Sequence, residues 1–156
     1  MRRREFLGLL SCAPAAWALA ARAQQRRIPT VGILGPQPKS VHFGDAIRAG
    51  LRDLGYVEGQ NILIEARWAN GRFERLPGLA AELVRLETDV LVTSLTQATL
   101  AAKRATTRIP IVMAGVGDPV AAGIIDSLAR PGGNITGTAS LIVDIVGKQL
   151  ELLKEI

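Results

Sequence analysis

The sequence predicts an α/β protein with a doubly wound parallel sheet of five strands and helices on both faces. Short apolar, β-branched runs alternate along the chain with segments whose apolar residues recur at helical spacing. Most of these runs are apolar throughout, as in the buried centre of a parallel sheet, whereas residues 61–68 alternate between apolar and polar. Alternation is typical of an edge strand, so we expect the strand order 2-1-3-4-5.

The predicted elements are, in order, a strand at 30–34, a helix at 43–54, a strand at 61–68, a helix at 76–86, a strand at 89–94, a helix at 97–106, a strand at 109–115, a helix at 120–129, a strand at 134–138 and a helix at 145–156. Glycine, proline and serine at 35–40 predict the first loop. The first helix should end at Gly55, a residue suited to a C-terminal cap. Pro77 is compatible with the second helix only in its first turn. The segment 130–134, with its proline and two glycines, should stop the fourth helix.

Composition limits the classes of function. The chain has 156 residues, enough for one domain, and a formal net charge of +5. From Gln24 onward 15 basic residues face 13 acidic ones, and aromatic residues make up only 4% of the chain. A near-balanced body with few aromatic residues gives no case for nucleic-acid binding.

The first 23 residues have the features of an export signal peptide. Arginines precede an apolar run, and a small-residue cleavage pattern follows it. The residues that resemble a twin-arginine export motif are Arg3, Arg4, Phe6 and Leu7, and those that form the cleavage pattern are Ala21 and Ala23. An ordinary Sec signal or a membrane anchor is the alternative, although the apolar run is interrupted by Pro14 and is short for a span of roughly 20 residues. The single cysteine, Cys12, lies inside this segment, so cleavage would leave a chain without cysteine.

Ligands of open α/β sheets bind outside the carboxyl ends of the strands. The loops after the first, third and fourth strands therefore hold the candidate ligand-binding residues: Gln37, Ser40, Ser94, Thr96, Gln97, Gly117 and Asp118. Hydroxyls and helix-start amides suit the carboxylate of an amino-acid-like ligand. Two of these residues have an alternative structural role, because Thr96 and Asp118 could each be a helix N-cap, with Pro119 the first helical residue after Asp118.

The glycine-containing loop at 114–123 does not match a nucleotide site. A dinucleotide fingerprint needs a glycine where Val120 stands. The loop also lacks the lysine that a phosphate-binding loop carries after its last glycine. No catalytic set is visible either, since His42 is the only histidine and neither Ser94 nor Thr96 has a basic partner in the sequence. We expect neither a cofactor nor a metal ion.

Two stretches carry a resemblance to a known family. They are "LRDLGYVEGQNILIEARWANGRFERLPGLAAELVRLETDVLV" and "AAKRATTRIPIVMAGVGDPVAAGIIDSLARPGGNITG", followed by "LELLKE". Together they resemble the ABC transporter substrate-binding proteins of the tryptophan/tyrosine type. The resemblance implies a type I periplasmic-binding fold, with two lobes that close on an amino-acid-like ligand. It also implies a non-enzymatic periplasmic protein that delivers its ligand to an ABC permease in the inner membrane.

The resemblance divides the chain into the signal at 1–23, an N-terminal lobe at 24–140 and, at 141–156, the start of a crossover helix toward a second lobe. Because family members continue into that lobe, this chain is expected to be truncated or to rely on a second lobe from another chain. The alternatives are a free-standing flavodoxin-like regulatory or enzymatic domain and a nonfunctional gene fragment.

Overall fold

The computed structural model describes residues 27–37 and 42–140, together with Glu151, Leu152 and Lys154, which are helical. The predicted export signal, Ser40 and most of the predicted final helix lie outside the described residues. Within the described ranges, no helix combines the length and apolar character that a membrane crossing requires.

All strand pairs are parallel, and the sheet has the order β2-β1-β3-β4-β5. The elements are β1 (Thr30–Gly35), α2 (Phe43–Asp53), β2 (Leu63–Trp68), the 3-10 turn η1 (Phe73–Arg75), α3 (Leu76–Arg85), β3 (Val90–Ser94), α4 (Leu95–Ala105), β4 (Ile111–Val116) and β5 (Ile135–Ala139). The predicted fold class and strand order are therefore confirmed, and the alternating strand lies at an edge.

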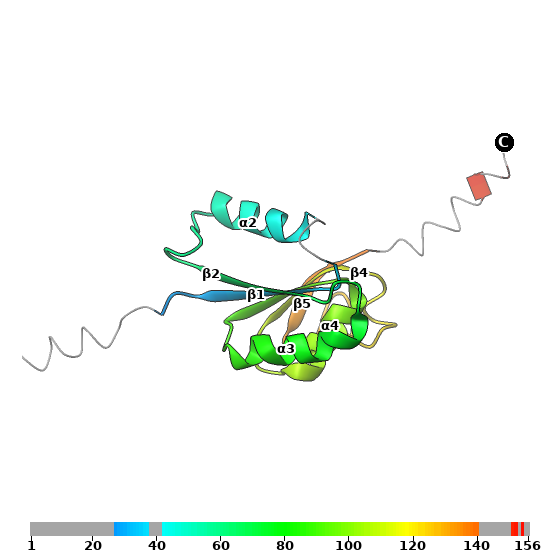
Figure 1. The fold of residues 1–156 in the computed structure, drawn as a ribbon. Helices are drawn as coiled ribbons and strands as arrows, with labels where there is room; N and C mark the ends of the chain where they lie inside the picture. The colour runs from blue at the N-terminus through cyan, green and yellow to red at the C-terminus, as the bar shows by residue number, and fades with distance from the viewer. Residues whose placement is uncertain (1–26, 38–41, 141–150, 153, 155–156) are drawn as a thin grey trace, which may run out of the picture.

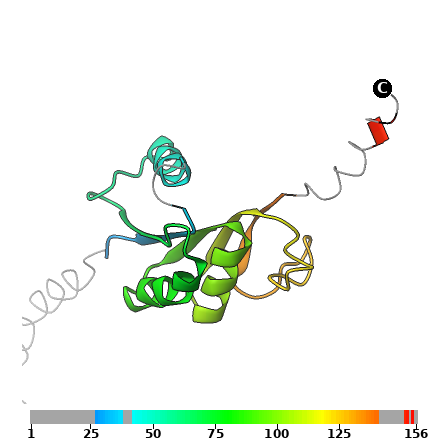
Figure 2. The same ribbon diagram turned by 45° about the vertical axis from the view of Figure 1, so that its right-hand side comes forward.

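Helices cover the two faces of the sheet unequally. Figure 1 shows α2 on one face and α3 and α4 on the other, and the turned view in Figure 2 keeps this separation. Successive side chains of a strand point to opposite faces. Val31 and Ile33 of β1 accordingly pack in the core under α2, whereas Leu34 belongs to the core under α3 and α4. The two cores thus lie on opposite faces of the sheet.

Local signals for the ends of two helices are correct. Gly55 has φ 86°, which glycine adopts without steric cost. The amide of Tyr56 donates to the carbonyl of Leu51 at 2.9 Å and that of Gly55 to Arg52 at 2.9 Å, the pair of bonds that defines a Schellman cap. Pro77 lies in the first turn of α3, as predicted.

The predicted helix at 120–129 is wrong, because these residues form turns and bends instead. Gly123 adopts φ 66°, which takes the chain out of the right-handed path after one turn. The amide of Ile124 then donates back to Pro119 O at 2.8 Å. Lys103 Nζ of α4 donates to the carbonyls of Gly123 at 2.6 Å and Ile124 at 3.0 Å. These contacts from another element satisfy backbone groups that a continuing helix would have satisfied itself.

Candidate functional site

A pocket of about 240 Å³ lies at the carboxyl ends of four strands. It is lined by Pro36, Gln37, Phe43, Trp68, Ser94, Leu95, Ala114 and Gly115. These residues come from the end of β2, the loop after β1, the first turn of α2, the junction of β3 with α4, and the last part of β4. The lining is mostly apolar, with one hydroxyl and one carboxamide.

The predicted ligand-binding residues divide between this pocket and its surroundings. Gln37 and Ser94 line the pocket. Thr96 and Gln97 lie in the first turn of α4, outside the lining, and Gly117 and Asp118 follow the end of β4. Ser40 is outside the described residues. The pocket therefore lies at the carboxyl ends of the strands, where ligands of open α/β sheets bind. The ligand contacts of all these residues stay a prediction.

One carboxylate oxygen of Asp118 forms hydrogen bonds within the loop after β4. Asp118 Oδ1 accepts hydrogen bonds from the amides of Val120 at 3.0 Å and Ala121 at 2.9 Å. This is the capping geometry predicted for Asp118, but it caps one turn rather than a helix. The capping role thus fixes the backbone after β4, whether or not the carboxylate meets a ligand.

Helix α4 begins at Leu95, two residues earlier than the predicted 97. Ser94, not Thr96, therefore holds the N-cap position, which corrects the alternative role considered for Thr96. The Ser94 side chain makes no capping hydrogen bond. Its hydroxyl is thus placed at a helix N-terminus and at the pocket without being used to close the helix, which suits an anionic ligand group.

Trp68, the last residue of β2, occupies space that two glycines leave open. In the parallel register Trp68 pairs with Gly35. A Cβ at Gly35 would overlap the six-membered ring of Trp68 and would lie 2.8 Å from Ser94 Oγ. A Cβ at Gly44 would lie 3.3 Å from Trp68 Cζ2. The indole is therefore held against β1 and α2, where it forms one side of the pocket.

Sequence reasoning missed the aromatic side of this pocket. The predicted ligand-binding residues lie in the loops after three strands and do not include Trp68, although the predicted strand at 61–68 ends with that residue. Phe43 begins the predicted helix at 43–54, and it also packs against the core under α2. Nothing in the sequence indicates that the side chain of Leu95 lines a pocket, because the residue pattern does not mark where α4 begins.

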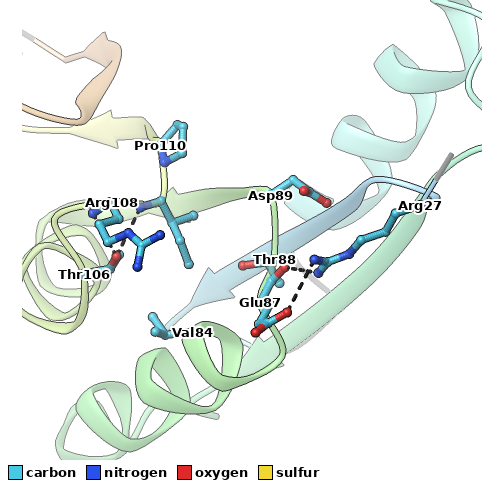
Figure 3. Close-up of a pocket in the computed structure, with 9 residues that line it drawn as sticks. Arg27, Val84, Glu87, Thr88, Asp89, Thr106, Arg108 and Pro110 are labelled. Atoms are coloured by element: carbon cyan, nitrogen blue, oxygen red, sulfur yellow. Dashed lines mark hydrogen bonds and ion pairs between the residues drawn. The ribbon is translucent and has the colours of Figure 1, made fainter. Parts of the chain in front are cut away.

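A larger cavity, of about 540 Å³, lies at the opposite end of the sheet. Figure 3 shows its lining: Arg27, Val84, Glu87, Thr88, Asp89, Thr106, Arg108, Ile109 and Pro110. Arg27 and Glu87 form an ion pair at 3.4 Å, with side chains 58% and 78% exposed. Such exposed pairs contribute about 0–1 kcal/mol.

The polar groups of this larger cavity hold loops together. Asp89 Oδ2 accepts from Thr30 N at 2.7 Å. Thr106 Oγ1 accepts from the amides of Arg108 at 3.1 Å and Ile109 at 3.2 Å. Since the cavity lies where the strands begin rather than where they end, the smaller apolar pocket is the better candidate for ligand binding in this sheet.

The sequence of this chain matches a protein family and a known relative. A sequence model of the family described as "ABC transporter substrate binding protein" matches residues 37–156. The tyrosine-binding protein of Clostridioides difficile strain R20291 is 38% identical over 104 residues. That alignment covers 67% of this chain but only 30% of the relative.

Solved structures share both the fold and part of the sequence. A Streptococcus pneumoniae ABC domain in complex with L-Trp has 28% identity and a TM-score of 0.67, over 72% of this chain and 39% of the other. A conserved domain protein from Vibrio cholerae O1 biovar El Tor strain N16961 has 33% identity and a TM-score of 0.71, over 83% and 44%. A ligand-free, open substrate binding protein with adhesive properties from Clostridium difficile has 32% identity and a TM-score of 0.67, over 81% and 43%.

This chain thus spans less than half the length of each of these relatives and structures. The match to the family nevertheless extends from the loop after β1 to the last residue, and the sheet has the parallel order of periplasmic-binding domains. The chain belongs to the ABC transporter substrate binding protein family.

Proposed function

We propose that this chain supplies one wall of a ligand cleft for an amino acid with an aromatic side chain, such as L-tryptophan or L-tyrosine. The apolar pocket at the carboxyl ends of the strands is the observation that carries the proposal. Trp68, Phe43 and Leu95 line it. An aromatic ligand side chain would pack on these residues, and aromatic pairs prefer offset or edge-to-face contact.

The polar end of the ligand would lie toward the start of α4. Ser94 offers a hydroxyl, Gln37 a carboxamide, and the first turn of α4 the amides that a helix leaves without internal partners. A carboxylate is the ligand group that this combination favours. Thr96 and Gln97 would flank it, and Gly117 and Asp118 would approach it from the next loop.

The volume of the pocket supports a shared cleft. Ligand pockets usually measure about 300–1,000 Å³, and the pocket in this chain measures about 240 Å³. We propose that the opposite wall comes from a second lobe, as in two-lobed binders that close by a hinge. Family membership favours this function over a free-standing flavodoxin-like regulatory or enzymatic domain.

The transport role completes the proposal. The protein would be exported through the predicted signal at 1–23, bind its ligand in the periplasm without chemical change and deliver it to an ABC permease. Substituting both Arg3 and Arg4 by lysine should retain the precursor in the cytoplasm. Normal export of that double variant would exclude the twin-arginine route and leave the ordinary Sec route.

Nuclear magnetic resonance titration tests the binding proposal. L-Tryptophan added to the ¹⁵N-labelled chain should shift the backbone signals of Gln37, Ser94 and Gly115, while L-alanine should shift them much less. We expect Trp68→Leu to reduce these shifts. Phe73→Leu is the matched control, because Phe73 is an aromatic residue of η1, 46% exposed and outside the pocket lining. Shifts confined to the cavity of Figure 3, or none at all, would contradict the proposal.

A further inference from the structure

Leu95 has a backbone conformation that leucine rarely adopts. Its φ is 67°, in the left-handed region where bulky residues are outliers. The residue is the first of α4, is 44% exposed and lines the pocket. A left-handed residue that is not glycine persists only where its surroundings hold it in place. The structure must therefore contain contacts that oppose relaxation of Leu95.

A chain of two buried hydroxyls ends on this residue. Thr99 Oγ1 donates to Leu95 O at 3.0 Å, and Thr93 Oγ1 lies 2.8 Å from Thr99 Oγ1. A hydroxyl has a single proton to donate. Because Thr99 gives its proton to Leu95 O, Thr93 must be the donor in the bond between the two threonines. The chain therefore runs in one direction, from Thr93 through Thr99 to the carbonyl of Leu95.

The position of the two threonines makes this chain a connection between sheet and helix. Thr93 belongs to β3 and pairs with Leu34 of β1 and Met113 of β4, so its backbone is fixed from both sides. Both threonines are fully buried, at 0% exposure. The bond between the two threonines is buried, and low polarity strengthens hydrogen bonds that form a chain. The sheet thus holds the carbonyl of Leu95 through two side chains.

We propose that Thr99 and Thr93 are positioning residues for ligand binding, which act by holding Leu95 in the left-handed conformation that presents its side chain to the pocket. The proposal rests on the proposed function of that pocket. Threonine bonding to the carbonyl four residues before it is common in helices. In this chain, however, the acceptor carbonyl belongs to the left-handed residue Leu95. The Thr99 hydroxyl that donates to it also accepts a hydrogen bond from Thr93 of β3.

The experiment compares variants of the full chain by two readouts. The coupling between the amide and α protons of Leu95 reports φ in the absence of ligand. The initial slope of the chemical shift changes with L-tryptophan reports affinity, even far below saturation. Thr99→Val keeps the shape of the side chain but removes the hydroxyl, and Thr99→Ser keeps the hydroxyl. Thr88→Val is the control, because Thr88 is also buried, at 3% exposure, but bonds to Leu83 O at the other end of the sheet.

Thr99→Val should shift Leu95 toward negative φ and weaken L-tryptophan binding about tenfold, the size expected for one lost buried hydrogen bond. Thr99→Ser should restore both readouts, and Thr88→Val should change neither. In a Leu95→Gly background, where positive φ has no steric cost, Thr99→Val should have little further effect on affinity. If Thr99→Val does not fold, Thr93→Val is measured instead, with a smaller loss of affinity expected.

A positive φ of Leu95 in Thr99→Val would overturn the proposal. So would a loss of affinity on Thr99→Val that is as large in the Leu95→Gly background as in the wild-type background. The two proposals fail differently. A wild-type chain whose pocket signals do not respond to L-tryptophan would refute the proposed function, and with it the binding role of the threonines. In that case the coupling of Leu95 in the variants would still show whether the hydroxyls hold its backbone.

Discussion

Replacing Gly35 by alanine should displace Trp68 and damage the pocket. The added Cβ would lie 2.8 Å from Trp68 Cε3 and from Ser94 Oγ. Carbon atoms attract best at about 3.5–4.0 Å, so the ring has to move by roughly 1 Å. The backbone of Gly35 has little freedom to yield, because β1 is bonded to β2 on one side and to β3 on the other.

Two effects of this substitution oppose each other. Alanine reduces the freedom of the unfolded chain, which stabilises the folded state by about 0.4–1 kcal/mol where the geometry permits. Overpacking a well-packed site costs about 1–3 kcal/mol. Overpacking should dominate, because an indole is rigid and the new methyl group would also lie too close to Ser94 Oγ. We expect a net destabilisation of about 1–2 kcal/mol.

Urea unfolding followed by tryptophan fluorescence measures both consequences. The chain contains two tryptophans, so Trp17→Phe makes Trp68 the sole reporter. Gly35→Ala should lower the urea midpoint and change the emission maximum of the folded state. Gly32→Ala is the matched control on the same strand, because its Cβ would meet Leu91 Cδ2 at 2.6 Å, in the other core. An unchanged emission maximum and midpoint in Gly35→Ala would refute the reasoning.

Three further substitutions test the backbone and the loop after β4. Gly50→Ala should stabilise the chain by about 0.5–1 kcal/mol in urea unfolding, because a Cβ there meets nothing within 4 Å and alanine favours a helix. Gly55→Ala should instead destabilise by about 1–2 kcal/mol, since Gly55 has φ 86°. Lys103→Met should destabilise by about 1 kcal/mol, because the carbonyls of Gly123 and Ile124 lose a donor. Hydrogen exchange should then speed up in the loop after β4 while the amides of β1 stay protected, and an unchanged loop would contradict that role of Lys103.

The order of the sheet was predictable because it depends on burial, which the residue pattern records. Residues 61–68 alternate and lie at an edge, and the apolar runs lie inside. The cap at Gly55 was predictable for a similar reason, since a single residue type meets a local backbone requirement. The segment 120–129 was not, because the chain leaves the helical path at Gly123 and its carbonyls accept from Lys103 of another helix, and periodicity reveals neither feature.

The candidate site shows the same division between local and long-range information. Ser94 and Gln37 were predicted from the ends of strands, which is a local inference. The place of Trp68 follows from its parallel register with Gly35, more than thirty residues earlier in the chain. The carbonyl of the left-handed Leu95 accepts from Thr99, whose hydroxyl is bonded to that of Thr93 on the preceding strand. Such positions arise from packing between elements, so no pattern within one element predicts them.

The shape of the pocket implies that this chain alone holds its ligand weakly. An aromatic side chain buries about 150–250 Å² when it is enclosed. One wall can cover roughly half of that area, which at about 25 cal/mol per Å² contributes on the order of 2–3 kcal/mol. A dissociation constant of 1 mM already requires about 4.1 kcal/mol after the loss of translational and rotational freedom. Hydrogen bonds from Ser94 and the start of α4 add about 0.5–1.5 kcal/mol each. The dissociation constant of this chain alone therefore stays near or above the millimolar range. Tighter binding requires a second surface that encloses the other face of the aromatic ring.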